Sequence, residues 1–458
     1  MMFISEKHEK IFQRVLKEIK PTEEERRKQL EVAEKIVKRL DELTPKDVKI
    51  ELTGSTAKGT NLRGDMDFDV FMLFSKDYSL KDVLSLGLKY AKKFCGKNKY
   101  EIAYAQHPYL RTWVDGVEVD IVPSYKIDDI SEMTTAVDRT PLHTKYVNRK
   151  ITDKQRDEVR LLKKFLKTQK IYGAEGRIRG FSGYLCELLI LKYGGILELF
   201  DAATRWRDQQ VIILDEEPSE SKVKELKNKF KDAALIVIDP VDPERNVAAS
   251  VSKTSLSVFI YSAEMFLNKP SISAFLPSQE KINKKWIEKQ LKLRDSLIIG
   301  LEFKRPDVVE DILWPQLYRF AEKIKSKMEE NDFKVFDIDI YANGKCMLLC
   351  EFSVYSLPRI LKIYGPPLSQ KENVQRFIRQ HNVTEPIWFE NERILAVGER
   401  KYTHVNEIIE EILKKPKENG VPPDVLKVIK TAKIINADKI KRNYTQFLFE
   451  YLKKRNVP

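Results

Sequence analysis

The stretch at residues 54–74 reads GSTAKGTNLRGDMDFDVFMLF and constrains the fold more than any other segment. Residues 70–74 form a continuous apolar run, the pattern of a strand that is covered on both faces. Asp65, Asp67 and Asp69 occupy alternate positions where this strand begins, so their carboxylates are expected to project in one direction. Like charges so close together repel, and they stay ionised at neutral pH only beside a cation. The stretch therefore predicts a buried strand with a divalent metal site at its start.

The surrounding residues predict a small mixed α/β sheet. A helix is expected over residues 22–43, because a threonine offers an N-cap, glutamates follow it, and apolar residues then recur at helical spacing. A strand is expected to run into a tight Gly-Ser turn at residues 54–55, and a basic helix is expected at about 80–94. Two further strands, YEIAYAQHPYLRTWV and VEVDIVPSY, should pair antiparallel around an Asp-Gly turn at residues 115–116.

The rest of the chain changes pattern twice. From about residue 151 it is helical, and a second α/β stretch starts near residue 270 and contains a hairpin that turns at Asn343-Gly344. The end of the chain, from about residue 400, is helical and basic. With 458 residues the chain has room for two to four domains, each with its own core. We expect an α+β fold with several domains.

The composition indicates a soluble, folded protein. The chain is 42% hydrophobic and 33% charged, which is not typical of disorder, and no apolar run approaches the length that crosses a bilayer. The N-terminal sequence MMFISEKHEKIFQRVLKEIK predicts an amphipathic helix with acidic residues, unlike a signal peptide. The four cysteines are too few and too scattered for a disulfide framework, so we expect reduced core cysteines and a cytoplasmic protein.

The formal charge of +13 suits a polyanionic partner, and its distribution is uneven. From Lys414 to the end there are 12 Lys/Arg against 4 Asp/Glu, an excess of +8 in the tail alone. Such a run is often only a solvated helix face. Beside a nucleotide site, contact with a phosphate backbone becomes the favoured interpretation.

Gly54 and Ser55 join the aspartates in one candidate site. Glycine has no Cβ, so backbone N–H groups can approach a phosphate chain closely, and serine adds a hydroxyl. Lys58 and Arg63 follow as cations. In VEVDIVPSY, Asp120 lies between apolar residues where the buried face should be, and a buried aspartate needs a partner.

Each of these features has an ordinary structural explanation when it is taken alone. Gly-Ser is a common turn, and Asp-x-Asp at a strand start is often a polar edge. Their combination, in this order and spacing, predicts two-metal phosphoryl transfer, in which one ion lowers the pKa of an attacking hydroxyl and the other neutralises a triphosphate. Oxygen ligands and phosphates indicate Mg²⁺.

Gly-Ser, eleven residues, Asp-Phe-Asp before an apolar strand and a later lone aspartate resemble the nucleotidyltransferase superfamily of DNA polymerase β. Within it, the sequence is similar to the archaeal, class I CCA-adding enzymes (tRNA nucleotidyltransferases). The likeness covers nearly the whole chain and rests on long segments: YAQHPYLR, VEVDIVPSY, TAVDRTPLHTKYV, RLLKKFLKTQKIYGAEGRIRGFSGYLCELLI, DPVDPERNVAASVS and LKIYGPPLSQKENVQRFIRQH. The signature of the bacterial and eukaryotic class is not found here.

The resemblance implies which carboxylates are catalytic. Asp65-Met66-Asp67 also satisfies Asp-x-Asp, but the family places its pair directly before the apolar strand, which selects Asp67 and Asp69. These two would bridge two metal ions, and Asp120 would hold the ion that activates the terminal hydroxyl. Asp65 would then lie further out.

The resemblance also implies how the nucleotide is held. Gly54, Ser55 and Lys58 would contact phosphates, although relatives commonly carry arginine at the position of this lysine, so a point contact replaces a fork. The remaining phosphate contacts would come from His143, Tyr172 and Lys163, with Lys164 as the alternative to Lys163. Arg245 resembles the family's base-reading arginine, whose planar fork could accept C or A and reject G and U. His107 is expected to be a structural neighbour of the catalytic strand.

The family fold implies a polymerase-β-like head at residues 1–150, a helical neck at 151–265, an α/β body at 266–400 and a basic, tRNA-binding tail at 401–458. The implied reaction is template-independent addition of C, C and A to the 3′ end of tRNA from CTP and ATP, with pyrophosphate released at each step. The tRNA acceptor stem would lie across body and tail, no membrane is involved, and a homodimer is left open.

Two rival functions remain at this point. A poly(A)-type or oligoadenylate-type polymerase on the same head would be indifferent to CTP and would continue beyond three nucleotides. An RNA-binding protein with an inactive head would be expected to lack a carboxylate or the Gly-Ser pair, and neither is missing.

Overall fold

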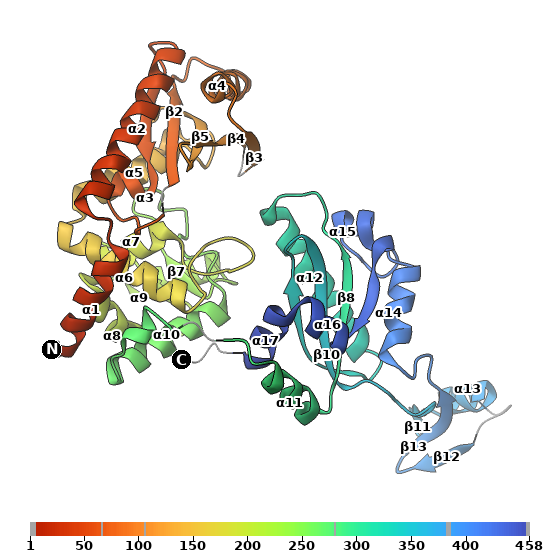
Figure 1. The fold of residues 1–458 in the computed structure, drawn as a ribbon. Coiled ribbons are helices and arrows are strands. Elements are labelled where there is room, and N and C mark those ends of the chain that lie inside the picture. The colour runs from red at the N-terminus through yellow and green to blue at the C-terminus, as the bar shows by residue number, and fades with distance from the viewer. Residues whose placement is uncertain (1–5, 66, 105–106, 279–280, 382–385, 455–458) are drawn as a thin grey trace. The chain divides into compact units, whose positions relative to one another are not determined.

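The structure is a computed structural model that describes residues 6–65, 67–104, 107–278, 281–381 and 386–454. The chain forms two compact units, Met1–Gln279 with Arg455–Pro458, and Glu280–Lys454. The first unit runs from red to green in Figure 1, and the second runs from green-blue to blue.

A mixed five-stranded sheet organises the first part of unit one. Its strands have the order β1-β2-β5-β4-β3, with β2 and β5 parallel and every other pair antiparallel. They are β1 (Lys49–Thr53), β2 (Asp67–Phe74), β3 (Tyr100–Tyr104), β4 (Pro108–Val114) and β5 (Val117–Tyr125). The antiparallel pairing around the Asp-Gly turn is confirmed, since Val114 of β4 pairs with Val117 of β5. The single strand expected over residues 100–114 is wrong: it is two strands, β3 and β4, which pair antiparallel with each other.

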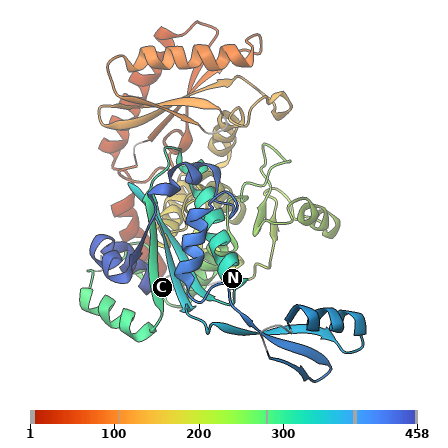
Figure 2. The same cartoon turned by 90° about the vertical axis from the view of Figure 1, so that its right-hand side faces the viewer.

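Strand β2 is buried on both faces, as its apolar run predicts. Phe68, Val70, Met72 and Phe74 pack with α2 (Glu23–Leu43) and α4 (Leu80–Cys95), while Phe71 packs on the other face. Figure 2 shows α4 (orange) lying across one face of this sheet. Both helices were expected, and α2 begins at a capping box made by Thr22 and Glu25.

The rest of unit one is mainly helical, as expected. Its large apolar core also includes α1 (Glu6–Ile19), which packs on α6 through Phe12, Val15 and Ile19. The remaining elements of this unit are α3 (Gly54–Lys58), η1 (Ile130–Glu132), α5 (Arg139–Lys150), α6 (Asp153–Thr168), α7 (Gly183–Tyr193), α8 (Ile196–Ala203), β6 (Gln210–Ile212), α9 (Glu220–Lys229), β7 (Leu235–Val237), α10 (Lys253–Asn268) and η2 (Ile272–Ala274).

Unit two is built on an antiparallel sheet of order β14-β8-β10-β9. Alternate residues of β8 and β10 belong to two different hydrophobic cores, one on each face of the sheet. Helices α12, α14 and α15 cover one face, and α11, α16 and α17 cover the other. The bounds are α11 (Lys284–Arg294), β8 (Leu297–Lys304), α12 (Glu310–Glu329), β9 (Lys334–Tyr341), β10 (Lys345–Val354), α14 (Val405–Lys414), α15 (Pro423–Val428), η3 (Ile429–Thr431), β14 (Lys433–Asn436), α16 (Ala437–Asn443) and α17 (Thr445–Lys453). The hairpin expected around Asn343-Gly344 is the β9–β10 connection.

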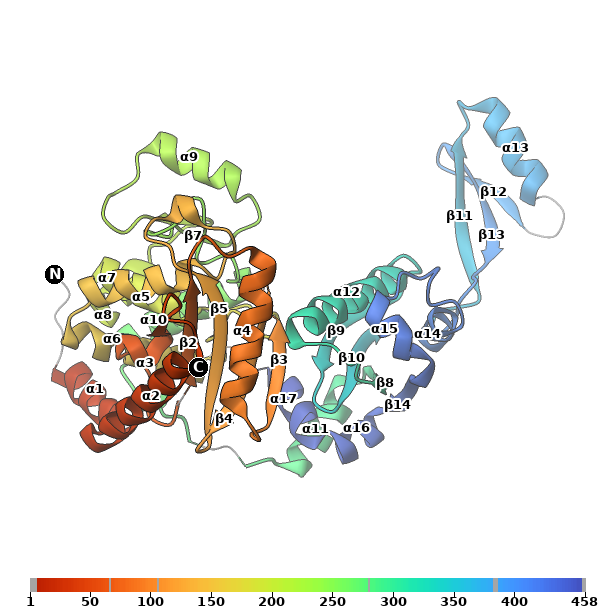
Figure 3. The same ribbon diagram turned by 90° about the horizontal axis from the view of Figure 1, so that it is seen from above.

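A second, smaller sheet in unit two has the order β11-β13-β12 and carries α13 on one side, as Figure 3 shows. Its elements are β11 (Ile360–Pro367), α13 (Lys371–His381), β12 (Ile387–Glu390) and β13 (Arg393–Glu399).

The basic end of the chain is not purely helical. Strand β14 pairs with β8, and Leu448, Tyr451 and Leu452 of α17 are buried in the same core as Met347 of β10. The four-part division of the chain stays a prediction. Cys95, Cys186, Cys346 and Cys350 are buried free thiols, as expected. No helix among the described residues is long and apolar enough to span a bilayer.

Candidate active site

The predicted carboxylates lie on two adjacent parallel strands. Asp67 and Asp69 begin β2, and Asp120 on β5 is the register partner of Asp69. The expectation that Asp65 continues this strand is wrong: β2 begins at Asp67, and Asp65 lies in the preceding loop, where its Oδ2 is 2.6 Å from the Lys167 ammonium. The structure therefore groups Asp67, Asp69 and Asp120 at one place on the sheet.

The carboxylates of this group disfavour each other's charge. Burial, reinforced by the nearby charge of Asp120, raises the pKa of Asp69 to about 6. Burial also raises the pKa of Asp67, with further repulsion from Asp65 and Asp120. Burial and neighbouring carboxylates raise pKa values in this way at sites that bind a cation, because the cation supplies the missing positive charge.

Arg111 on β4 donates hydrogen bonds to the carboxylate of Asp120. Its Nε and Nη2 donate to the two Asp120 oxygens at 2.7 and 2.8 Å, and Nε lies 2.9 Å from Glu118 Oε1. Within the described ranges, no group of three or more His, Cys, Asp or Glu side chains is arranged closely enough to hold a metal ion. The aspartates are thus adjacent, but Asp120 is directed to the guanidinium.

Gly54 is required for the close packing of this group. Its φ of +75° is in the left-handed region, and a Cβ at this position would lie 2.0 Å from Asp69 Oδ2. The Gly-Ser turn expected here is the first turn of the short helix α3. Any larger residue would displace the carboxylate that it faces.

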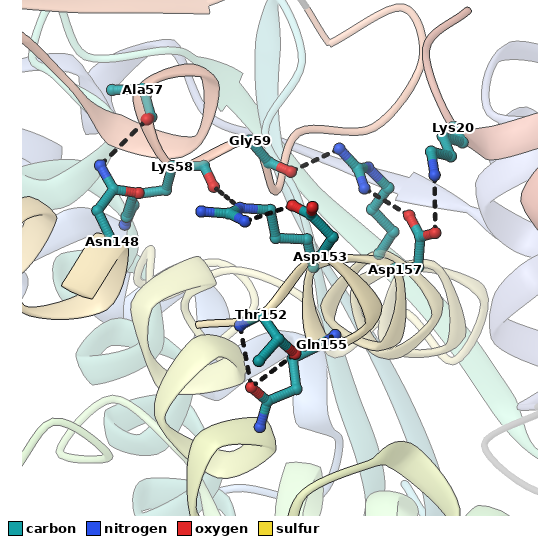
Figure 4. A network of polar contacts seen from close by, with 11 residues as sticks. Lys20, Ala57, Lys58, Gly59, Asn148, Thr152, Asp153, Gln155 and Asp157 are labelled. Atoms are coloured by element: carbon teal, nitrogen blue, oxygen red, sulfur yellow. Dashed lines mark hydrogen bonds and ion pairs between the residues drawn. The ribbon is translucent and has the colours of Figure 1, made fainter. Parts of the chain in front are cut away.

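Helix α3 and the loop after it are attached to α5 and α6 through backbone carbonyls, as Figure 4 shows. Asn148 donates to the Ala57 carbonyl at 3.3 Å. Arg156 and Arg160 of α6 donate to the carbonyls of Lys58 and Gly59 at 3.0 and 2.5 Å. These bonds place the Gly-Ser segment in a defined position relative to the lysines of α6.

A buried carboxylate that the sequence analysis missed connects the two predicted phosphate-binding lysines. Glu187 of α7 lies 2.6 Å from the Lys58 ammonium and 3.7 Å from that of Lys163, and it accepts a bond of 2.6 Å from the Thr60 hydroxyl. Burial alone would raise the pKa of Glu187, but the charges of the two lysines outweigh it and the pKa is lowered. Lys163 also donates to the Thr60 carbonyl, whereas no such contact is recorded for Lys164 in the described chain. Glu187 lies within a segment of family resemblance, but nothing local marks it.

A cavity of about 330 Å³ lies beside this cluster. Four predicted nucleotide-binding residues line it: Gly54, Lys58, His143 and Arg245. A second cavity of about 570 Å³ shares Arg139, Ser182 and Arg245 with the first. Gly54 belongs to both the first cavity and the carboxylate group, so the two parts of the site meet at this residue.

His143 and Arg245 are connected by another buried carboxylate that the sequence analysis did not single out. The Asp239 Oδ2 atom lies 2.8 Å from His143 Nε2 and accepts a bond of 3.0 Å from Arg245 Nη1. Burial lowers the pKa of His143, against the opposing effect of Asp239. The His143 ring stacks on Tyr184 at a centroid distance of 4.0 Å.

The remaining predicted residues lie around these clusters. Ser55 is partly buried in α3. The backbone of Tyr172 forms an isolated parallel β-bridge with Phe181. The Lys167 ammonium lies over the Tyr172 ring, 5.3 Å from the ring centroid. Burial raises the pKa of Tyr172. His107 lies 2.6 Å from the Pro123 carbonyl of β5, which confirms it as a neighbour of the strand that carries Asp120. Neither Ser55 nor Tyr172 is among the residues that line the two cavities.

Three family profiles match the chain in order. They are described as "Nucleotidyltransferase domain" over residues 33–145, "tRNA nucleotidyltransferase, second domain" over residues 157–276 and "CCA-adding enzyme, C-terminal domain" over residues 294–437. Together they span both units of the structure.

Curated relatives agree with these profiles. The CCA-adding enzyme of Methanocaldococcus jannaschii is 38% identical over 415 residues, covering 88% of this chain and 90% of the relative. That of Archaeoglobus fulgidus is 38% identical over 87% of each chain, and that of Methanothermobacter thermautotrophicus is 35% identical over 88% of each. The carboxylate pair, the Gly-Ser segment and nearly the full length of the chain point the same way. The chain belongs to the family of CCA-adding enzymes.

Proposed function

We propose that this chain adds C, C and A to the 3′ end of tRNA from CTP and ATP without a nucleic-acid template and releases pyrophosphate at each step. The observation that carries the proposal is the meeting at Gly54 of a carboxylate group and a cavity lined by cationic side chains. Nucleotidyl transfer needs both, one at the reacting phosphate and the other along the triphosphate.

The carboxylates suit a divalent metal, on which the nucleotidyltransferase family depends, and we propose Mg²⁺ at Asp67, Asp69 and Asp120. Their oxygens are hard donors, and burial together with the charge of Asp120 raises the pKa of Asp69 to about 6, which favours a cation at this position. A bound metal would neutralise phosphate charge and acidify the terminal hydroxyl. Arg111 orients Asp120 through two hydrogen bonds, from Nε and Nη2.

The triphosphate would be held by Lys58 and His143 in the cavity, with Ser55, Lys163 and Tyr172 around it. Lys58 and Lys163 share the single counter-charge of Glu187, so one positive charge remains available to phosphate. Ordered lysines that are already desolvated bind an anion with little further loss of side-chain entropy.

The base would be selected by Arg245, which lines both cavities. A planar guanidinium can donate two parallel hydrogen bonds to one base edge. This geometry would suit the acceptors of C or A and reject G and U.

The acceptor stem of tRNA would be bound by basic residues of unit two. The exposed cations near the chain end include Lys430, Lys433, Lys439 and Arg442. The wide minor groove of A-form RNA presents 2′-hydroxyls and phosphates rather than sequence, which suits an enzyme that must accept every tRNA. Sedimentation of the purified chain with and without tRNA would test for a homodimer.

The proposal is tested by incubating the chain with Mg²⁺, all four nucleoside triphosphates and a tRNA that lacks its last three nucleotides. We expect product ends that read CCA and stop. Long A tails would instead place the chain with poly(A)-type polymerases. Binding of tRNA without any extension would favour an inactive head.

A further inference from the structure

Asp239 is buried behind the wall of the nucleotide cavity and does not line it. Its two carboxylate oxygens accept four hydrogen bonds. Oδ2 lies 2.8 Å from His143 Nε2 and 3.0 Å from Arg245 Nη1, while Oδ1 accepts bonds of 3.0 Å from the Tyr184 hydroxyl and from the Val241 amide. Each oxygen therefore has two partners, which is close to what a carboxylate oxygen can accept in this setting.

The partners of Asp239 come from three separate segments. His143 lies on α5, Tyr184 on α7, and Arg245 on the loop that follows β7. The same loop is tied to α5 a second time, because Arg139 Nη1 lies 2.6 Å from Asp242 Oδ2. One buried carboxylate thus sets where three cavity-lining side chains stand relative to each other.

Arg245 needs such a support more than its neighbours do. Its side chain is 32% exposed, and a partly exposed arginine has many rotamers of similar energy. Asp239 occupies one Nη atom of the guanidinium and leaves the remaining donors of the fork for a ligand. His143 is restrained in the same way, by the Asp239 bond on one side and Tyr184 stacking on the other.

We propose that Asp239 is a positioning residue for nucleotide selection, which fixes Arg245, His143 and Tyr184 before CTP or ATP arrives. The inference rests on the proposed function, and it adds a residue that touches neither nucleotide nor metal. It acts through the side chains that it orients.

The test compares Asp239→Asn with the wild-type chain on a tRNA that lacks its last three nucleotides. The asparagine keeps the size of the side chain but replaces one accepting oxygen by a donor, which faces other donors. We expect the KM values for CTP and ATP to rise about tenfold or more, from loss of hydrogen bonds to a charged group. We also expect discrimination of CTP against UTP to fall about tenfold, while kcat changes by less than about threefold.

A matched control is Glu351→Gln in unit two. Glu351 is also a buried carboxylate, which accepts bonds from Arg294, Ser296 and Tyr451 within the core of that unit. Its substitution should lower thermal stability and leave the discrimination of CTP against UTP unchanged. The control separates a loss of buried hydrogen bonds in general from a loss at this cavity.

Epistasis gives the second readout. If Asp239 acts through Arg245, the double variant Asp239→Asn/Arg245→Gln should select nucleotides no worse than Arg245→Gln alone. Should Asp239→Asn fail to fold, Asp239→Glu keeps the charge and displaces it by one methylene, with the same sign of effect expected. Unchanged selection in a folded variant, or a fall in kcat with unchanged KM and discrimination, would overturn the inference. Absence of CCA addition by the wild-type chain would instead overturn the proposed function.

Discussion

Asp69 and Asp239 both lie in unit one, and both are shielded from water, yet they acquire opposite acid strengths. Asp69 is partly buried and its pKa is raised to about 6, mainly by burial and then by the charge of Asp120. Asp239 is more deeply buried, and burial alone would raise its pKa as well; the bonds from His143, Val241 and Arg245 outweigh burial and lower it to about 2. Burial acts in the same direction on both carboxyls, so it does not by itself decide the sign of the pKa shift. The partners do.

The difference separates two uses of a carboxylate. Within the part of the chain that the structure describes, no hydrogen bond to the Asp69 side chain is recorded, while Asp239 accepts four. A buried carboxylate that has no hydrogen-bond donor or cation beside it can bind a cationic ligand. A carboxylate whose oxygens already accept several hydrogen bonds instead fixes the positions of the donor side chains.

The largest effect is expected for Asp69→Asn. Nucleotide incorporation should fall about 10³-fold or more, since a preorganised electrostatic group at the reacting phosphate is removed. Thermal stability at pH 7 without divalent metal should rise instead. A carboxyl whose pKa is raised from 3.8 to about 6 stabilises the fold below about pH 4, and this stability is lost as the pH rises through 6, by up to about 3 kcal/mol.

Melting curves and primer extension measure the two effects on the same Asp69→Asn preparation. Asp65→Asn is the matched control, because Asp65 lies outside the strand and its partner Lys167 is on the protein surface. We expect this control to be nearly as active as the wild type. Equal losses of nucleotide incorporation in Asp69→Asn and Asp65→Asn would contradict the assignment of Asp67 and Asp69 as the catalytic pair.

The next effect is expected for Glu187→Gln, which keeps the shape of the side chain and removes its charge. Lys58 and Lys163 then face each other without a counter-charge in a buried place, which costs about 3–5 kcal/mol of unfolding free energy. Urea denaturation at pH 7 measures this loss. Because burial already lowers the pKa of Lys163, the variant should regain part of its stability as the pH is raised and that lysine deprotonates. A stability equal to wild type would show that the lysines do not depend on Glu187.

Asp239→Asn should destabilise the chain by about 1–3 kcal/mol at pH 7, the sign opposite to Asp69→Asn. A carboxyl whose pKa is lowered from 3.8 to about 2 contributes stability above pH 4, and this contribution is lost as the pH falls toward 2. The stability difference between wild type and variant should therefore be full at pH 7 and shrink between pH 4 and pH 2. Acid titration of the unfolding free energy of both chains measures it. A difference that does not depend on pH in this range would contradict the contrast with Asp69.

The smallest effect is expected in the basic tail. Truncation is a poor test there, because β14 belongs to the sheet of unit two and α17 to its core. The paired substitution Lys433→Gln and Lys439→Gln removes two exposed charges, and we expect it to leave the fold unchanged because neither side chain is buried. If both cations contact phosphates, the slope of log binding constant against log salt for tRNA should fall by about 1.4–1.8. An unchanged slope would remove these two residues from the tRNA surface.

Local sequence pattern was sufficient to predict many of the helices, strands and turns. The apolar run after Asp69, the Thr22 cap and the Asp-Gly turn at residues 115–116 each follow from short-range chemistry, and each is confirmed. Asp65 was assigned to the same strand because alternation cannot show where a strand starts. Its pairing with Lys167, 102 residues away, depends on how α6 packs.

The order of residues was enough to predict the parts of the site and to identify the family to which the chain belongs. The predicted parts are a Gly-Ser segment, two strand carboxylates and a third carboxylate on another strand. How those groups are charged and held depends on contacts between segments that are far apart in the chain. Asp120 is beside Asp69 because β2 and β5 pair in parallel, and Glu187 and Asp239 become important through partners 129 and 96 residues away in the chain. The acidity of a carboxyl depends on what the fold places within a few ångströms of it, and no local pattern contains that information.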